Sequence, residues 1–212
     1  IRRDIAELSE LRAVTRTHGG ASLPQRREEL PFDAKVMSFL PEKRRIGAHV
    51  GSMIAPGSTI ALGGGTTVMQ ILPAIRRMEL KLVTTALDLR DASDVAVTLT
   101  GGTLRRRTAE MVGHIAERTL RDVNFDVAVI GVDGIDAQGG LTTYDSSEAY
   151  VNRVMLEQAR EVWIVADHSK FGQCLPAQIA PLEGVSKIIT DTGASDAMIA
   201  DAKLAGIEVL RV

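Results

Sequence analysis

One stretch, residues 125–148 (FDVAVIGVDGIDAQGGLTTYDSSE), constrains the fold more than any other part of the chain. Asp126–Ile130 is a short apolar run rich in β-branched residues, which predicts a strand buried on both faces. Glycines and acidic residues follow, and Asp145 and Glu148 then stand three apart before apolar residues at helical spacing, which indicates a capping box that opens a helix. In open α/β sheets ligands bind where parallel strands end, so we expect a binding site in this stretch.

The same alternation of strand, polar loop and helix runs from Thr59 to Val212. Strands are expected at residues 59–62, 80–84, 95–99, 126–130, 161–166, 187–190 and 207–212. Helices are expected at about residues 68–75, with Pro73 an awkward residue inside, at 113–121, from 145 onward and at 195–205. This alternation predicts an α/β fold with a mainly parallel sheet covered by helices.

The composition limits the classes of protein to which this chain can belong. A chain of 212 residues with 45% hydrophobic residues can build one good-sized core. No apolar run approaches the roughly 20 residues that span a bilayer, so we expect no membrane partner. The single cysteine, Cys174, excludes an internal disulfide and favours the cytoplasm. The four histidines are scattered without metal-ligand spacing, so we expect neither a metal nor a cofactor.

The first 40 residues differ in charge and pattern from the rest of the chain. Residues 1–27 carry six arginines against three acidic residues, whereas the remainder has 19 basic and 24 acidic residues. A basic end is typical of a polyanion-binding arm, and a solvated surface helix would give the same charge. Residues 1–11 show helical spacing, residues 12–17 alternate like a strand, and residues 20–34 contain two prolines and look like a linker. Pro41 then suits the first turn of a helix.

Four expected strand ends carry polar, glycine-rich turns, at residues 63–67, 101–105, 131–143 and 167–170. Contiguous glycines followed by threonines at a helix N-terminus can present amides to an anion, although a plain tight turn has the same residues. Lys170 could add a cation. Asp133 and Asp136 with Glu148 could bind sugar hydroxyls or act as acid and base. Alternatively, the two aspartates could only cap a turn and Glu148 could only complete the capping box of a helix. Their convergence at one sheet edge favours a ligand site.

The motifs GGGTT, TGGTLR, GVDGI, GGLTT and ADHSKFG, in this order and spacing, resemble the C-terminal sensor domain of the DeoR family of bacterial sugar-metabolism regulators. The resemblance covers essentially the whole chain. It implies a fold like that of ribose-5-phosphate isomerase and a phosphorylated sugar or related metabolite as effector. It implies that the phosphate is bound by Gly64, Gly65, Thr66, Thr67 and Lys170, and the hydroxyls by Asp133 and Glu148. The other effector-binding candidates at these strand ends are Thr85, Gly102, Arg105, Gly134, Thr142 and Thr143.

The N-terminal residues resemble the end of the recognition helix and the wing of that family's winged helix-turn-helix. The resemblance implies contacts with operator DNA from Arg2, Arg3, Arg16 and His18. It also leads us to expect the first two-thirds of that domain upstream of Ile1. The expected organisation is therefore residues 1–22 as the end of the DNA-binding domain, 23–40 as a linker and 41–212 as the effector-sensing domain. Palindromic operators would require a homo-oligomer, a dimer or a tetramer.

Two departures bear on the choice between sensor and enzyme. The isomerase has a lysine just before its second glycine cluster, where this chain has Gln138. Loss of that acid–base group favours binding without turnover. Regulators often carry Thr-Asn-Ser where this chain has residues 84–86 as Thr-Thr-Ala, which would change the metabolite that fits. The alternatives are a sugar-phosphate isomerase or CoA-transferase-like enzyme with Glu148 as its acidic group, and a ligand-binding module without a DNA role.

Overall fold

The computed structural model describes residues 15–17, 20–22, 29–89 and 95–212. The chain divides into two compact units, Ile1–Pro31 and Phe32–Val212. In the first unit, strands β1 (Thr15–Thr17) and β2 (Gly20–Ser22) pair antiparallel. The strand expected over residues 12–17 is thus present at its C-terminal end, whereas the helix expected over residues 1–11 lies outside the described residues.

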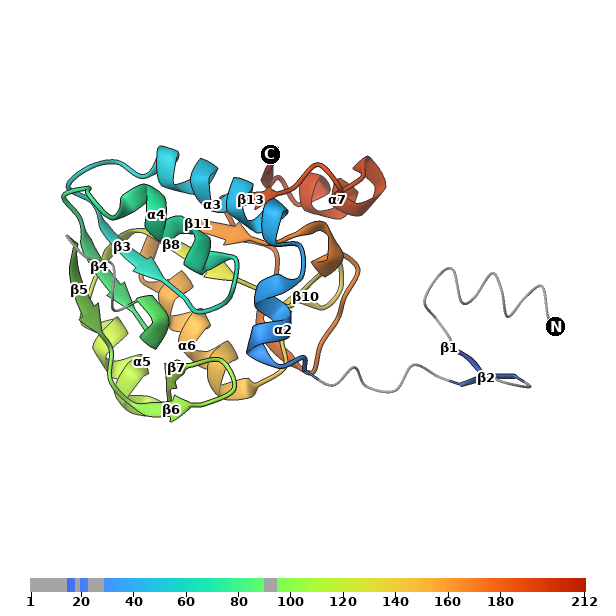
Figure 1. Ribbon diagram of the computed structural model, residues 1–212, viewed down its shortest axis with the longest axis horizontal. Coiled ribbons are helices and arrows are strands. Elements are labelled where there is room, and N and C mark those ends of the chain that lie inside the picture. The colour runs from blue at the N-terminus through green and yellow to red at the C-terminus, as the bar shows by residue number, and fades with distance from the viewer. Residues whose placement is uncertain (1–14, 18–19, 23–28, 90–94) are drawn as a thin grey trace. The chain divides into compact units, whose positions relative to one another are not determined.

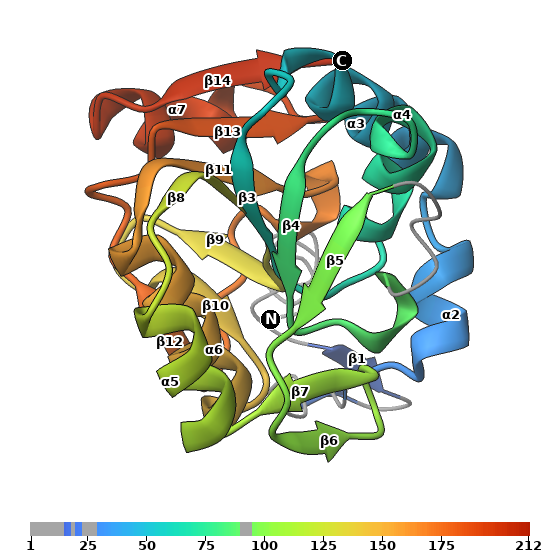
Figure 2. The same cartoon turned by 90° about the vertical axis from the view of Figure 1, so that its left-hand side faces the viewer.

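The second unit is built on a seven-stranded sheet in the order β14-β13-β11-β8-β3-β4-β5, and every neighbouring pair in it is parallel (Figures 1 and 2). This confirms the parallel α/β sheet that the sequence predicts. The strands are β3 (Thr59–Leu62), β4 (Lys81–Thr84), β5 (Ala96–Leu99), β8 (Phe125–Gly131), β11 (Ala159–Val165), β13 (Lys187–Thr190) and β14 (Glu208–Arg211).

Helices cover both faces of this sheet, so its strands are apolar on both sides. Along β8, Val127 and Val129 join one apolar cluster, while Ala128 and Ile130 join the other. The first cluster also contains residues of α3 (Leu40–Met53), the 3-10 helix η1 (Val68–Ile71) and α4 (Leu72–Ile75). The second contains residues of α5 (His114–Arg121), α6 (Ser146–Glu157) and α7 (Asp196–Leu204). Two-sided burial is why β8 reads as a continuous apolar run rather than an alternating one.

Pro73 fits because the expected helix over residues 68–75 is two helices in succession. The 3-10 helix η1 ends at Ile71, and α4 begins at Leu72 with the proline in its first turn. At that position the missing N–H of proline breaks no helical hydrogen bond.

The order of the strands defines where a ligand can bind. From β3 the chain adds β4 and β5 on one side, and then returns to place β8, β11, β13 and β14 on the other. Loops after β3 and β8 therefore leave the sheet in diverging directions. In open α/β sheets ligands bind at such a point, and we call the region at the carboxyl ends of these two strands the crevice.

Three parts of the fold were not expected from the sequence. A three-stranded antiparallel sheet, in the order β12-β10-β9, contains β9 (Gly134–Asp136), β10 (Gly140–Thr143) and β12 (Ala177–Ala180). A hairpin joins β6 (Thr103–Arg105) to β7 (Glu110–Val112). Helix α2 (Phe32–Met37) occupies part of the stretch interpreted as a linker. These elements are three to six residues long, too short to show a clear period, and none of the residues of α2 is buried.

Substitution of Gly47 tests how closely α3 packs on η1. A methyl group at this position would lie 2.3 Å from the carbonyl oxygen of Gln70, so the two helices would have to separate. We expect Gly47→Ala to lower the free energy of unfolding by about 1–3 kcal/mol, as overpacking does. Helix propensity alone predicts the opposite sign. Urea unfolding, with Ser52→Ala on the exposed face of α3 as the control, decides between them.

Candidate functional site

The loop after β3 presents backbone amides at the crevice. Gly65 has φ +110°, a conformation that favours glycine, and Thr66 and Thr67 are buried beside it. In the parts of the chain that the structure describes, no acceptor receives the amides of Gly64, Gly65, Thr66 or Thr67. Buried amides without a partner are uncommon, and their proximity to a helix start suits an anion. The loop could therefore bind an anion through these amides, as the sequence predicts.

Gly64 is required by the approach of Glu110 from the β6–β7 hairpin. A Cβ atom built at Gly64 would overlap the Glu110 carboxyl group, at 1.9 Å from its Cδ atom. Glu110 is itself buried, and this burial raises the pKa of its carboxyl well above the ordinary value, with the charges of Glu148 and Asp133 adding to the shift. A buried carboxyl group with a raised pKa thus lies against Gly64 of the loop.

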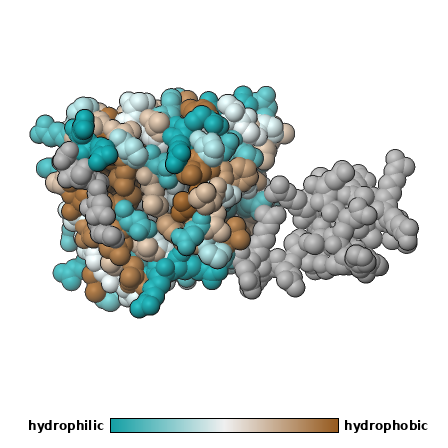
Figure 3. Space-filling view, in the orientation of Figure 1, coloured by the Kyte–Doolittle hydropathy of each residue, from teal (hydrophilic) through white to brown (hydrophobic). Residues whose placement is uncertain are grey.

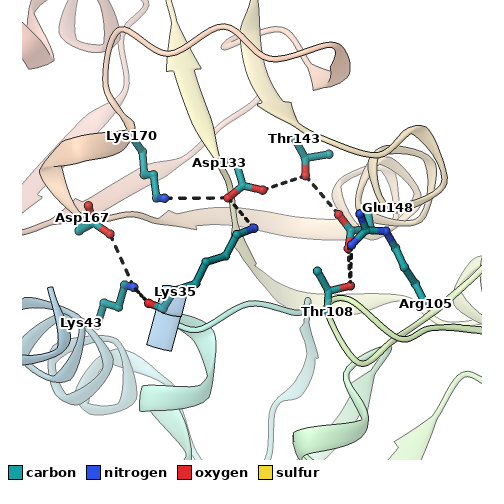
Figure 4. A network of polar contacts seen from close by, with 9 residues as sticks. All are labelled: Lys35, Lys43, Arg105, Thr108, Asp133, Thr143, Glu148, Asp167 and Lys170. Carbon is teal, nitrogen blue, oxygen red and sulfur yellow. Dashed lines mark hydrogen bonds and ion pairs between the residues drawn. The ribbon is translucent and has the colours of Figure 1, made fainter. Parts of the chain in front are cut away.

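A chain of oxygen atoms joins the two acidic residues that the sequence singled out (Figure 4). The Thr143 hydroxyl lies 3.1 Å from Asp133 Oδ2 and 3.3 Å from Glu148 Oε2. It has one proton and donates to one carboxylate at a time. Asp133 follows β8, Thr143 ends β10 and Glu148 lies in the first turn of α6. Three elements thus bring these oxygen atoms together, where the carboxylates could accept hydrogen bonds from hydroxyl groups.

Arg105 and the hairpin fix the second carboxylate. Arg105 Nη1 lies 3.0 Å from Glu148 Oε1, and its Nε lies 3.3 Å from Asp145 Oδ2. Thr108 donates to the same Glu148 oxygen at 2.5 Å. Asp145 caps α6 by accepting from the amides of Ser147 and Glu148, and these bonds and Arg105 lower its pKa despite some burial. The helix start expected at Asp145 is confirmed, and the Glu148 side chain also has partners across the crevice.

Three lysines bring positive charge to the opposite side of the site. Lys35 of α2 lies 3.3 Å from Asp133 Oδ1, and Lys170, after β11, lies 3.9 Å from the same oxygen. Lys43 of α3 is 3% exposed and lies 4.0 Å from Asp167 Oδ2. Burial lowers the pKa of Lys43 to about 8, although the charge of Asp167 opposes the shift. Asp133 therefore lies between two cations, with a third close behind them.

The candidates from the sequence fall into different groups in the structure. Contacts link one group, which comprises Arg105, Asp133, Thr143, Glu148 and Lys170. Gly64, Gly65, Thr66 and Thr67 follow β3, the strand beside β8, and so lie at the same edge of the sheet. Gly102 and Gly134 instead pack against backbone, where a Cβ would lie 2.7 Å from the carbonyl of Val112 and 2.3 Å from that of Gln173. Thr142 also has a structural bond, since its hydroxyl accepts from the amide of Leu175 at 3.1 Å.

Thr85 lies after β4 at the same edge of the sheet. It is fully buried, its hydroxyl has no partner among the described residues, and its carbonyl accepts from the amide of Met111 at 2.7 Å. The sequence analysis missed Lys35, Lys43, Thr108 and Glu110, because only the fold brings them to the crevice. It included the turn at residues 167–170 but assigned no role to Asp167, although an acidic residue directly after the strand Glu161–Ala166 was an available signal.

The DNA-binding candidates cannot be placed in this way. Arg2, Arg3 and His18 lie outside the described residues, and only the backbone of Arg16 is described, within β1.

Two comparisons with known families now bear on identity. The model of the DeoR C-terminal sensor domain matches residues 39–192, and that of the DeoR-like helix-turn-helix domain matches residues 1–27. The chain belongs to the DeoR family. It is accordingly a transcriptional regulator with a DNA-binding part and a sensor domain, and the enzyme alternatives are set aside.

Individual relatives agree with the family. The glycerol-3-phosphate regulon repressor of Escherichia coli (strain K12) is 32% identical over 196 residues, which cover 90% of this chain and 78% of that protein. The transcriptional regulator GlpR of Haloferax volcanii is 36% identical over 197 residues, 90% of this chain and 77% of that protein. Ribose-5-phosphate isomerase A of Methanocaldococcus jannaschii is similar in structure, with a TM-score of 0.47 and 15% identity over 66% of this chain and 56% of that chain.

The surface and the side-chain clusters add two findings about this DeoR-family chain. None of the helices in the described part of the chain is long and apolar enough to cross a bilayer, and Figure 3 shows polar and apolar residues interspersed over the face in view. Among the described residues, no group of three His, Cys, Asp or Glu side chains could hold a metal ion.

The buried carboxyl of Glu110 predicts a pH dependence of stability. Because its pKa is raised, the folded state binds the proton more tightly than the unfolded chain does. This contribution is complete below the ordinary value of 4.5 and is lost as the pH rises through the folded-state pKa. Glu110→Gln needs no proton, so the variant should lose less stability between pH 5 and pH 8. Urea unfolding at each pH measures this, and slopes equal to those of the wild type and of exposed Glu183→Gln would contradict it.

Proposed function

We propose that the chain is a repressor of a carbohydrate operon and that its sensor domain binds a phosphorylated sugar or polyol at the β3–β8 crevice. The observation that carries this proposal is the amide loop at Gly64–Thr67, whose amides have no acceptor in the described chain. Lys170 adds a cation 3.9 Å from Asp133, which follows the neighbouring strand β8. Amides and a lysine are the groups that proteins use to hold a phosphate. The carboxylates of Asp133 and Glu148 lie where the hydroxyl groups of such a molecule would follow.

Each part of the site has a distinct task under this proposal. The amides of the loop and Lys170 neutralise the phosphate. Asp133 and Glu148 accept hydrogen bonds from hydroxyl groups, which distinguishes a sugar or polyol phosphate from inorganic phosphate. Arg105 acts on Glu148, which it holds 3.0 Å away, and so orients an acceptor rather than contacting phosphate. The relatives whose names mention a glycerol-3-phosphate regulon make small polyol phosphates the first compounds to try.

In the proposed repressor, the N-terminal part binds operator DNA and so controls transcription. Arg2, Arg3, Arg16 and His18 are the residues proposed to contact operator DNA, in the segment that matches the helix-turn-helix model. A homo-oligomer would allow two such segments to read a palindromic operator in the cytoplasm. For the effector to change operator affinity, it must bind the sensor more tightly in one of two arrangements of the oligomer.

A thermal-shift panel tests the proposed effector class. The panel pairs sn-glycerol 3-phosphate, ribose 5-phosphate and fructose 6-phosphate with their unphosphorylated parents. At about 100 times its dissociation constant, an effector stabilises the domain by roughly 2.7 kcal/mol, a shift of a few degrees. We expect shifts from phosphorylated compounds only. Equal shifts from unphosphorylated parents would refute the phosphate site.

Lys170→Ala locates the phosphate group within the site. Removal of a charge-assisted hydrogen bond should weaken binding of the active phosphorylated compound by about 1.5–3 kcal/mol, roughly 10- to 100-fold. Isothermal titration calorimetry measures this loss, with Lys81→Ala as the control, because Lys81 is exposed at the opposite, amino-terminal end of β4. An unchanged dissociation constant for Lys170→Ala would remove Lys170 from the site.

Arg3→Ala, in a protein that carries the whole DNA-binding domain, tests the proposed output. Loss of one phosphate contact should weaken operator binding and make the dependence of log K on log[salt] less steep by about one unit. Fluorescence anisotropy with labelled operator DNA over a range of salt concentrations measures both quantities. An unchanged slope would show that Arg3 does not contact the DNA backbone.

A further inference from the structure

Helix α2 is anchored to the effector site rather than to the core. It spans only Phe32–Met37 and has no buried residue, and Met37 is 71% exposed. Helices this short have little stability of their own. It is also the first element of the sensor unit, directly after the boundary at Pro31. Its position is therefore set by a small number of specific contacts, and the described contacts lead to the crevice.

The first contact is made by the side chain of Lys35. Its ammonium group lies 3.3 Å from Asp133 Oδ1 and 5.2 Å from the centre of the Tyr144 ring, and the side chain is 15% exposed. Figure 4 shows Lys35 and Lys170 reaching the same oxygen of Asp133 from two sides. One carboxylate is thus shared by two cations, and one of the two comes from α2.

The second contact holds the C-terminal end of the helix. The buried Lys43 donates to the backbone carbonyl of Lys35 at 2.6 Å, and its ammonium group also lies 4.0 Å from Asp167 Oδ2. Carbonyls in the last turn of a helix lack helical partners, and a cation there is favourable. This contact connects α2 to the loop after β11, which also carries Lys170.

The third contact lies at the junction of α2 and α3. Phe39 has φ +54°, a left-handed conformation that costs energy for a residue with a side chain. Its ring meets the ring of His168 edge to face, with the centroids 4.7 Å apart, and His168 Nδ1 lies 2.9 Å from Asp191. The strained junction is thus attached to the 3-10 helix η3 (His168–Lys170), which presents Lys170 to the site.

We propose that Lys35 is a further effector-binding residue, and that α2 is the element through which occupancy of the site reaches the DNA-binding unit. The proposal rests on the proposed function. A hydroxyl group that takes Asp133 as its acceptor competes with Lys35, while the phosphate offers that ammonium group a partner of higher charge. Because none of the residues of α2 is buried and Lys35 provides its side-chain contact with Asp133, a change at Lys35 alters one of the few contacts that hold the helix. An effector that binds one position of α2 more tightly shifts the helix toward that position.

Calorimetry on Lys35→Met tests the contact with the effector. The variant keeps most of the length of the side chain and removes its charge, and Met37→Ala, on the exposed side of the same helix, is the matched control. The probes are inorganic phosphate, sn-glycerol 3-phosphate, ribose 5-phosphate and fructose 6-phosphate. For each compound that the wild type binds, we expect the dissociation constant to rise about tenfold or more in Lys35→Met and to stay within twofold in Met37→Ala.

Hydrogen exchange of residues 32–38 tests the link to α2 in the same samples. Without any probe, these amides should exchange faster in Lys35→Met than in the wild type, since the variant loses the contact with Asp133. A bound probe should change their exchange in the wild type at least threefold and leave it unchanged in Lys35→Met. Exchange that is the same in both proteins, with and without the probe, would overturn the inference.

The calorimetry distinguishes failure of the proposed function from failure of the inference about Lys35. If the wild type binds none of the phosphorylated probes, the proposed function fails and the role of Lys35 fails with it. If the wild type binds a probe and Lys35→Met binds it with the same affinity, the phosphate site remains and only the inference about Lys35 is overturned.

Discussion

The carboxylate of Asp133 is the group on which the other polar contacts of the crevice depend. It follows the central strand β8, and its two oxygens receive Lys35 and Lys170 on one side and Thr143 on the other. A carboxylate at this depth is favourable only with such partners, because leaving a charge unpaired there is costly. Each of these partners comes from a different element, so this one charge brings α2, η3 and β10 together at the end of the parallel sheet.

Glu110 and Glu148 carry the same chemical group, but their different surroundings give the two carboxyl groups different properties. Glu110 is buried against Gly64, and this burial, together with the charges of Glu148 and Asp133, raises the pKa of its carboxyl. Glu148 is paired with Arg105 and Thr108, and remains an acceptor at the crevice. Under the proposed function, the backbone amides and the lysines would offset the negative charge of these acids toward an anionic effector.

The sequence was most informative where burial was strongest. The seven strands of the parallel sheet were expected within one or two residues of their ends, because strands buried on both faces are continuous apolar runs. The start of α6 was also expected, since Asp145 carries a local capping signal. The short strands β9, β10 and β12 and the helix α2 were missed, because they are held by contacts with distant residues and have no period of their own.

The residues of the site also fall into those that the sequence indicated and those that only the fold brought together. The sequence by itself indicated the glycine-rich turn after β3 and the acidic residues after β8, because glycine at Gly65 has a positive φ and both features directly follow continuous apolar strands. Only the tertiary structure decided that Lys35, Lys43 and Glu110 belong to the same crevice. Lys35 lies 98 residues from Asp133 in the chain, and only the position of α2 beside the carboxyl edge of the sheet brings the two charges together.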